Sequence, residues 1–233
     1  MYRYAVYFAP PADHPLSRFA SGWLGRCPEG GPIGPRPAIA GVDRERLGQI
    51  VAEPARYGFH GTLKPPFRLA EGQSEPELAE RLADIAAGLA GFVLPPLDLR
   101  ALGRFLALVP EAPSPTLAAV AAACVTGLDA LRAPPTAAEL ERRRRATLDP
   151  RQEQLLARWG YPYLLDRFGF HLTLTGPLAE DERTLVRAAL APLVAPFCRA
   201  PLPFADLALF AEPAPGEPFR LARRFPLGVP PAS

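Results

Sequence analysis

Cysteine, lysine and histidine are scarce in this sequence. The three cysteines among its 233 residues (Cys27, Cys124 and Cys198) are far apart. They show neither the paired spacing of a zinc site nor the even number of a disulfide framework, which fits reduced thiols. The three histidines form no HExxH motif and no cluster with carboxylates. We therefore expect neither a metal ion nor a cofactor.

An excess of charge of one sign and long apolar runs are also missing. The formal net charge is +2, so no overall positive field attracts nucleic acid. The longest apolar stretch, near residues 117–128, is shorter than the ~20 residues that span a bilayer. The first residues lack a charged segment followed by a long apolar run, so no signal peptide is evident. We expect a cytoplasmic protein with no membrane contact.

Proline, by contrast, is abundant, with 31 residues. Hydrophobic content of 48% and charged content of 21% are those of a soluble globular protein, so we interpret the prolines as rigid loops and abrupt helix ends. The loop over residues 28–41 is rich in glycine, but it lacks the Gly-Lys-Ser/Thr ending of a phosphate-binding loop. We predict a single domain over residues 1–233.

The most informative feature is a phrase that occurs twice. Residues 56–67 read RYGFHGTLKPPF and residues 167–178 read RFGFHLTLTGPL, with seven of twelve positions identical. Two of the three histidines, His60 and His171, occupy matched positions 111 residues apart. A scarce residue at the centre of a repeated phrase is poorly explained by composition.

Read as β-strands, both copies separate their residues into two faces, because side chains alternate along a strand. His60, Thr62 and Lys64 share the polar face of the first copy. His171, Thr173 and Thr175 share the polar face of the second. Aromatic and aliphatic residues, Tyr57 among them, fall on the opposite faces and are expected in the core.

The polar faces carry the groups that phosphodiester hydrolysis requires. One group must take a proton from water, another must give one to the leaving oxygen, and donors must hold the phosphoryl oxygens. Histidine titrates near neutrality, at about 6.5, and two of them supply the acid and the base. The threonine two residues along points the same way and its hydroxyl donates to oxygen. We assign His60, His171, Thr62 and Thr173 as candidate catalytic residues, without deciding which histidine is the acid.

A helix and then a strand are expected after each copy, so the chain reads as an internal duplication with a helical insert over about residues 112–160. This predicts an α+β fold with two lobes, formed by two antiparallel sheets with helices outside. The histidine strands, at about residues 56–64 and 165–175, would face each other across a central cleft.

The paired His-x-Thr motifs resemble those of the two-histidine (2H) phosphoesterase superfamily, which includes RNA ligase-like proteins and cyclic phosphodiesterases. Four longer phrases resemble more closely the bacterial branch associated with phosphonate-utilisation operons, and they are YGFHGTLKPPF, LGRFLALVP, LDPRQEQLLARWGYPY and FGFHLTLTGPL. The resemblance implies a bilobal duplicated fold and metal-independent chemistry on a phosphodiester. His60, Thr62, His171 and Thr173 match its motif without departure.

Four further residues are candidates for substrate binding. Lys64 and Thr175 lie at matched positions on the histidine faces. Arg143 lies in the arginine run over residues 142–145, and one or two of these arginines would reach over the cleft to hold a phosphate. Tyr161, just before the second copy, either stacks on a base or belongs to the core.

Together these observations favour an enzyme that hydrolyses a small cyclic phosphodiester, such as a cyclic nucleotide or a ribosyl cyclic phosphate in phosphonate metabolism. The expected partner is a small phosphorylated or nucleotide-like molecule. Two alternatives stay open. RNA-end processing, by 2′,5′ ligation or cyclic-phosphate trimming, is less favoured because the net charge is small and no RNA-binding module is recognisable. A non-catalytic nucleotide- or phosphate-binding protein would bind such ligands without turnover.

Overall fold

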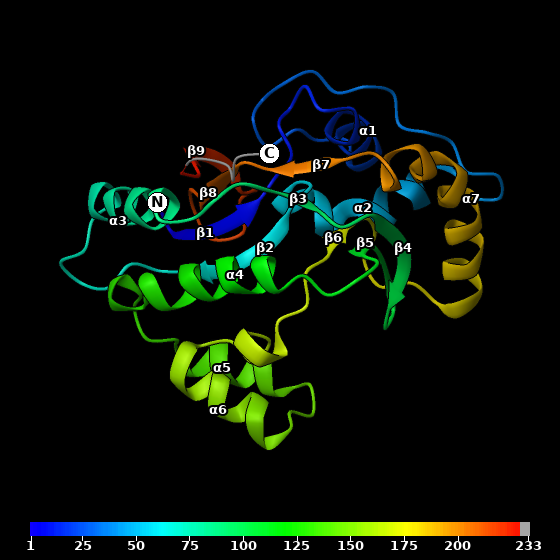
Figure 1. The fold of residues 1–233 in the computed structure, drawn as a ribbon. Coiled ribbons are helices and arrows are strands. Elements are labelled where there is room, and N and C mark those ends of the chain that lie inside the picture. Colours follow the sequence, from blue (N-terminus) through cyan, green and yellow to red (C-terminus); the bar gives the residue numbers. More distant parts are fainter. Residues whose placement is uncertain (229–233) are drawn as a thin grey trace.

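The computed structural model, described here over residues 1–228, shows an α+β protein (Figure 1). Its strands are β1 (Arg3–Phe8), β2 (Gly61–Phe67), β3 (Phe92–Leu94), β4 (Leu97–Leu102), β5 (Phe105–Pro110), β6 (Leu172–Thr173), β7 (Leu202–Phe204), β8 (Asp206–Glu212) and β9 (Arg220–Pro226). Its α-helices are α1 (Pro15–Leu24), α2 (Arg44–Tyr57), α3 (Glu75–Ala87), α4 (Pro115–Gly127), α5 (Ala137–Arg144), α6 (Pro150–Trp159) and α7 (Glu180–Cys198). Short 3₁₀ turns cover Asp129–Leu131 and Leu165–Arg167.

Seven strands form one antiparallel sheet in the order β4-β5-β6-β2-β1-β8-β9, and β3 and β7 form a second, two-stranded antiparallel sheet. The predicted α+β class with two antiparallel sheets is therefore confirmed. The two copies of the repeat are arranged differently from the facing lobes we expected. Strands β2 and β6 are direct neighbours in the larger sheet, where Gly61 pairs with Leu172. The site is built across one sheet because the second copy pairs with the first.

The two faces of the large sheet differ in what covers them. Helix α4 packs on β2, α3 packs on β8 and β9, and α7 packs on β4 and β5. Strand β1 shows the alternation, since Val6 belongs to the main core while Tyr7 belongs to a smaller apolar cluster with Phe210 and Phe219. The main core therefore fixes one face of the sheet and leaves the other free for chemistry.

The histidine strands are shorter than predicted, because other structure precedes each histidine. Helix α2 runs through Tyr57 and ends at Gly58, whose φ of 78° suits a residue without a side chain. A 3₁₀ turn occupies Leu165–Arg167, and β6 consists of two residues. The strand assignments for residues 56–60, 165–171 and 174–175 are wrong. A helix end and a 3₁₀ turn with an extended loop precede the two strands, so strand alternation does not apply there.

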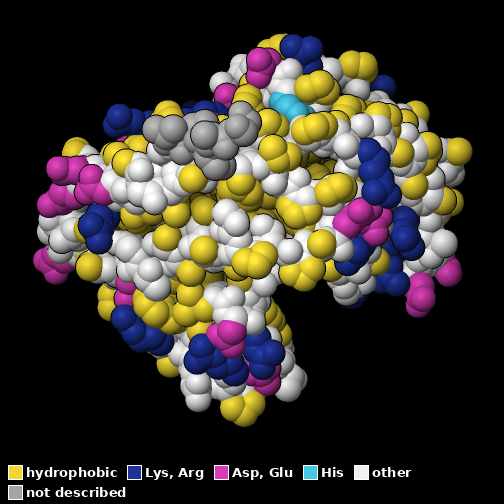
Figure 2. All heavy atoms as spheres, viewed as in Figure 1, with side chains coloured by type: hydrophobic (Ala, Val, Ile, Leu, Met, Phe, Trp, Pro, Cys, Tyr) yellow, Lys and Arg dark blue, Asp and Glu magenta, His cyan; other side chains and the backbone are white. Residues whose placement is uncertain are grey.

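The segment between the two copies carries α4, α5 and α6. Figure 2 shows that α5 and α6 project from the rest of the molecule and carry intermixed Lys/Arg and Asp/Glu side chains. Helix α5 begins with a capping box, in which Thr136 and Glu139 hold each other's backbone N–H groups, and it buries none of its residues. In the described part of the chain, no helix is long and apolar enough to cross a membrane.

Candidate active site

Both histidines stand immediately before the strand of their repeat and are held in the same way. The Nδ1 atom of His60 lies 2.9 Å from the carbonyl oxygen of Gly58, and that of His171 lies 2.9 Å from the carbonyl oxygen of Gly169. A carbonyl only accepts hydrogen bonds, so each Nδ1 carries the hydrogen and donates it. Each neutral ring therefore keeps Nε2 as its proton acceptor, available for chemistry.

The pairing of the two copies gives the site a local twofold arrangement. Gly61 and Leu172, the central residues of the two His-x-Thr motifs, lie opposite each other in antiparallel strands. Continuing this register places His60 across from Thr173 and His171 across from Thr62. Diagonal neighbours of this kind lie about 7–8 Å apart, which leaves room for one phosphoryl group between the two rings. Each histidine thus has one threonine beside it and another across the strand pair.

A cavity of about 860 Å³ opens over this arrangement. Its volume is in the range of about 300–1,000 Å³ that is usual for small-molecule sites. Among the residues proposed from sequence, its lining includes His60, Thr62, His171, Thr173, Thr175, Arg143 and Tyr161. The structure therefore brings together seven of the eight candidate residues, with Lys64 as the exception.

His60 sits in the more confined surroundings of the two histidines. Its ring stacks on that of Tyr7, with 3.8 Å between centroids, and its Nε2 lies 3.2 Å from the Thr62 hydroxyl. Burial among protein atoms lowers the pKa of His60 to about 4, although the bond to the Gly58 carbonyl acts in the opposite direction. Burial also lowers the pKa of His171, which lies near the ring of Phe105. The lowered pKa values favour the neutral form of both histidines.

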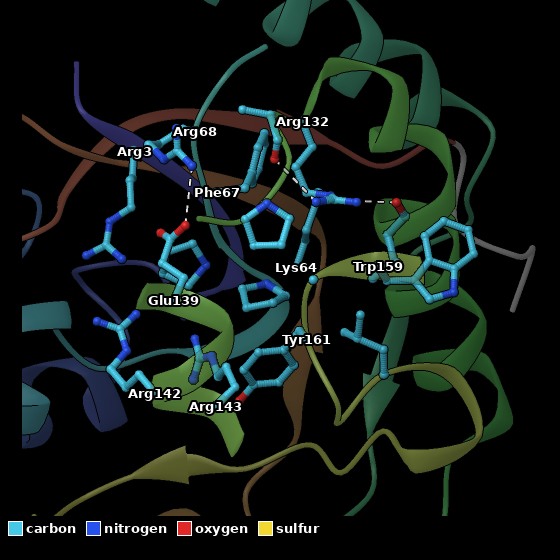
Figure 3. Close-up of a pocket in the computed structure, with 17 residues that line it drawn as sticks. Arg3, Lys64, Phe67, Arg68, Arg132, Glu139, Arg142, Arg143, Trp159 and Tyr161 are labelled. Carbon is cyan, nitrogen blue, oxygen red and sulfur yellow. Dashed lines mark hydrogen bonds and ion pairs between the residues drawn. The ribbon is translucent and has the colours of Figure 1, made fainter. Parts of the chain in front are cut away.

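Lys64 does not share the face of His60, so that expectation is wrong. The pairing of β2 with β1 is irregular on both sides of the Lys64–Val6 pair, next to Pro65 and Pro66, which cannot donate backbone hydrogen bonds. As a result Leu63 and Lys64 are both buried. The Lys64 ammonium donates to the Val125 carbonyl at 3.1 Å, and burial lowers its pKa to about 8. Lys64 lines a small adjoining pocket of about 40 Å³ (Figure 3).

The other three substrate-binding candidates, Thr175, Arg143 and Tyr161, line the cavity but differ in their contacts. The Thr175 hydroxyl accepts from the Leu106 N–H at 3.0 Å and donates to the Gly176 carbonyl at 2.9 Å, so its hydrogen is already used. Arg143 lies over the ring of Tyr161, with its guanidinium carbon 4.5 Å from the ring centroid. Arg143 and Tyr161 therefore form one wall together, and Thr175 helps to fix the strand that carries His171.

Sequence reasoning missed Tyr7 and Arg3, which line the cavity from β1. Arg56, which strand alternation placed on the His60 face at the rim of the cleft, and Tyr57 line it from the end of α2. We expected Tyr57 in the core, but it lines the cavity, because it is helical rather than part of a strand. The buried carboxylate of Glu212 holds both Arg3, at 2.5 Å, and Arg56. Only the repeat itself marks Arg56 in the sequence.

Within residues 1–228, no group of three or more histidine, cysteine, aspartate or glutamate side chains is arranged to hold a metal ion. Glu53 and Glu139 also line the cavity. Glu139 is engaged by Arg68 and by the N-terminus of its own helix.

Gly61 provides a test of the twofold packing. A Cβ added at this position would come within 2.3 Å of the ring of Phe170, the residue before His171. We expect Gly61→Ala to lower the free energy of unfolding by about 1–3 kcal/mol through overpacking. Urea denaturation measures this, and Gly169→Ala is the matched control because nothing lies within 4 Å of the added Cβ. Equal stability of the two variants would contradict the packing described here.

Comparison with known proteins relates most of the chain to one family and to longer proteins. A family model described as "Protein of unknown function (DUF1045)" matches residues 62–220. "Ribose 1,5-bisphosphate phosphokinase PhnN" from Janthinobacterium sp. (strain Marseille) is 41% identical over 234 residues, which cover 97% of this chain and 51% of the relative. The protein of the same name from Laribacter hongkongensis (strain HLHK9) is 41% identical over 226 residues, covering 95% and 51%. The chain spans about half the length of these curated relatives.

Solved structures with a similar arrangement include E. coli LigT in its apo form. The superposition covers 97% of this chain and 98% of LigT, at 16% sequence identity and a TM-score of 0.45.

Proposed function

The chain belongs to the family described as a protein of unknown function (DUF1045), and we propose that it is a phosphoesterase that hydrolyses a small cyclic phosphodiester without a metal ion. The observation that carries this proposal is the antiparallel pairing of the two His-x-Thr motifs under one cavity. It gives two proton-transfer groups and two hydroxyl donors around a space of phosphoryl size. The motif resemblance to the two-histidine phosphoesterases points the same way.

In the proposed reaction, His60 is the base and His171 is the acid. Nε2 of His60 takes a proton from water, and the water oxygen bonds to phosphorus. The phosphorus–oxygen bond to the sugar breaks, and the leaving oxygen takes a proton from Nε2 of His171. The products are a phosphomonoester and a free hydroxyl. The assignment follows from burial, because the base must be neutral and the pKa of His60 is held at about 4.

Thr62 and Thr173 hold the non-bridging oxygens in this proposal. Nε2 of the neutral His60 ring is an acceptor, so the Thr62 hydroxyl donates its hydrogen to it at 3.2 Å. A bound phosphodiester would compete for this hydrogen. The hydroxyl then turns to a phosphoryl oxygen, and Nε2 is released to accept the proton of water.

The relatives suggest the class of substrate. Their name describes a kinase that acts on ribose 1,5-bisphosphate. A phosphate-binding loop would need a lysine followed by serine or threonine, but the single lysine of this chain, Lys64, is followed by Pro65. The Gly-Lys-Ser/Thr ending of a phosphate-binding loop is therefore absent from this sequence, and we assign the kinase activity to the other half of the relatives. Opening a 1,2-cyclic phosphate on ribose 5-phosphate yields a ribose bisphosphate. A ribosyl cyclic phosphate therefore fits as the substrate, in the phosphonate context implied by the motif resemblance. Opening its cyclic phosphate would come before the kinase step.

The test is hydrolysis of 2′,3′-cyclic nucleotides and ribosyl cyclic phosphates in excess EDTA across pH 3–9. We expect full activity in EDTA and a bell-shaped profile of kcat/KM. Activity should fall as pH drops through about 4, where His60 becomes protonated. It should also fall as pH rises past the pKa of His171, which lies below 6.5. The optimum is therefore on the acid side of neutrality.

Three results would contradict the proposal. Loss of activity in EDTA with recovery on adding a divalent metal would remove the metal-independent mechanism. A profile that keeps rising from pH 6 to 9 would remove the assignment of His171 as the acid. Binding of cyclic diesters with no turnover of any of them would leave a binding protein in place of an enzyme.

A further inference from the structure

The cavity lining contains several arginines in addition to the two proposed catalytic histidines. Five arginines line it, namely Arg3, Arg56, Arg68, Arg142 and Arg143, against two carboxylates, Glu53 and Glu139. The whole chain has a net charge of only +2. Five arginines against two glutamates give the lining a larger excess of positive charge than the whole chain has.

The carboxylates leave part of this positive charge without a partner. Glu212 is shared by Arg3 and Arg56, and Glu139 is engaged by Arg68. Within residues 1–228, neither Arg142 nor Arg143 makes an ion pair with a carboxylate. Arg142 and Arg143 thus bring two uncompensated charges to the cavity wall.

The arginines come from opposite sides of the cavity and converge. Arg3 extends from β1 and is fixed by the buried Glu212, which also accepts from the Gly216 N–H at 2.9 Å. Arg142 extends from α5. In Figure 3 the guanidinium groups of Arg3 and Arg142 point toward each other beside Glu139. Two like charges that face each other repel, and a bound dianion between them removes the repulsion.

We propose that Arg3 and Arg142, supported by Arg143, form a second anion subsite that binds the terminal phosphomonoester of the substrate. This proposal rests on the proposed function, because it places the cyclic diester at His60 and His171 in the same cavity. The substrate class is then a sugar that carries a cyclic phosphodiester at one end and a phosphate at the other. A ribose with a 1,2-cyclic phosphate and a 5-phosphate is a molecule of this kind.

The subsite also explains the placement of α5. This helix buries none of its residues, and Glu139 anchors it to Arg68 while Arg143 rests on Tyr161. These charged and aromatic contacts hold α5 at the edge of the cavity. The residues that make them also line the cavity, where the substrate would bind. Substrate phosphate at Arg142 would add a further contact between α5 and β1.

Binding of ribose 5-phosphate, measured by calorimetry, tests the subsite without any turnover. We expect Arg142→Gln to weaken binding by about 10- to 100-fold, the effect of losing a charge-assisted contact. Arg145→Gln is the matched control, because Arg145 ends the same helix, is exposed and lines neither pocket. This control and His60→Ala should both bind as the wild type does. Arg142 makes no ion pair, so its removal should leave the fold intact.

Three outcomes overturn the subsite. They are wild-type protein that does not bind ribose 5-phosphate at millimolar concentration, Arg142→Gln that binds as the wild type does, and His60→Ala that loses binding while Arg142→Gln keeps it. The last would place the monoester at the histidines and leave the proposed function standing. Conversely, Arg142-dependent binding in a protein that hydrolyses no cyclic diester would support the subsite and reject the proposed function.

Discussion

Replacing His60 or His171 by alanine should lower kcat for the cyclic diester by about 10²- to 10⁴-fold, the usual contribution of a positioned acid or base. Each ring supplies one Nε2 to the cavity, and no third histidine lines it. The double variant should be little worse than the poorer single variant, because acid and base act as a unit. Single-turnover kinetics at the pH optimum measure the chemical step.

The third histidine supplies the control. His14 caps the N-terminus of α1, where its Nδ1 accepts from the Leu16 N–H at 3.2 Å, and it does not line the cavity. We expect His14→Ala to keep the wild-type kcat. Retention of full activity by His60→Ala or His171→Ala would reject the site.

Glu212→Ala should lower the free energy of unfolding by about 3–5 kcal/mol, the cost of breaking a buried ion pair by removing one partner. The carboxylate is fully buried and holds Arg3 and Arg56. Burial alone would raise the pKa of Glu212, but the hydrogen bonds from the two arginines outweigh it and leave the pKa below its ordinary value. Its contribution to stability is therefore present above pH 4.5 and is lost as pH falls through the lowered pKa.

Urea denaturation at pH 7 measures this loss, with the midpoint and slope fitted together. Glu111→Ala is the matched control, because Glu111 pairs with Arg199 at the surface, where 73% of the arginine side chain is exposed. Surface pairs of this kind contribute little. If Glu212→Ala were as stable as Glu111→Ala, the two arginines would not depend on Glu212 for their placement.

The repeat made most of the site predictable from sequence. His60, Thr62, His171 and Thr173 all reach one cavity, as their matched positions indicated. The alternation rule worked for Thr62 and Thr173, which lie in strands β2 and β6. It failed before these residues, because a helix end and an extended loop present side chains with a different geometry.

Lys64 shows why the alternation of a strand is unreliable for a residue next to prolines. Pro65 and Pro66 cannot donate backbone hydrogen bonds to β1, and the register of the pairing shifts beside Lys64. The Lys64 side chain is therefore buried. The two prolines in the sequence indicate that the strand pairing is irregular here. Alternation predicted that Lys64 faces the cavity, but the irregular pairing buries its side chain instead.

The residues that were missed depend on contacts between distant parts of the chain. Tyr7 reaches His60 because β1 pairs with β2, and Arg3 meets Glu212 because β1 pairs with β8. Neither contact leaves a local pattern. Short motifs identify chemistry within a strand, whereas sheet order decides which other side chains surround it.

The order of strands in the large sheet also determines when the site can exist during folding. Strand β1 lies between β2 and β8, so the first strand of the chain pairs with one that ends at Glu212. Pairings of such large sequence separation form slowly, because long loops must close before the contacts are made. On the ribosome, His60 is synthesised long before His171, and Arg3 waits for Glu212, which lies 209 residues later. A complete cavity therefore requires strand pairings that join residues from Arg3 to Glu212.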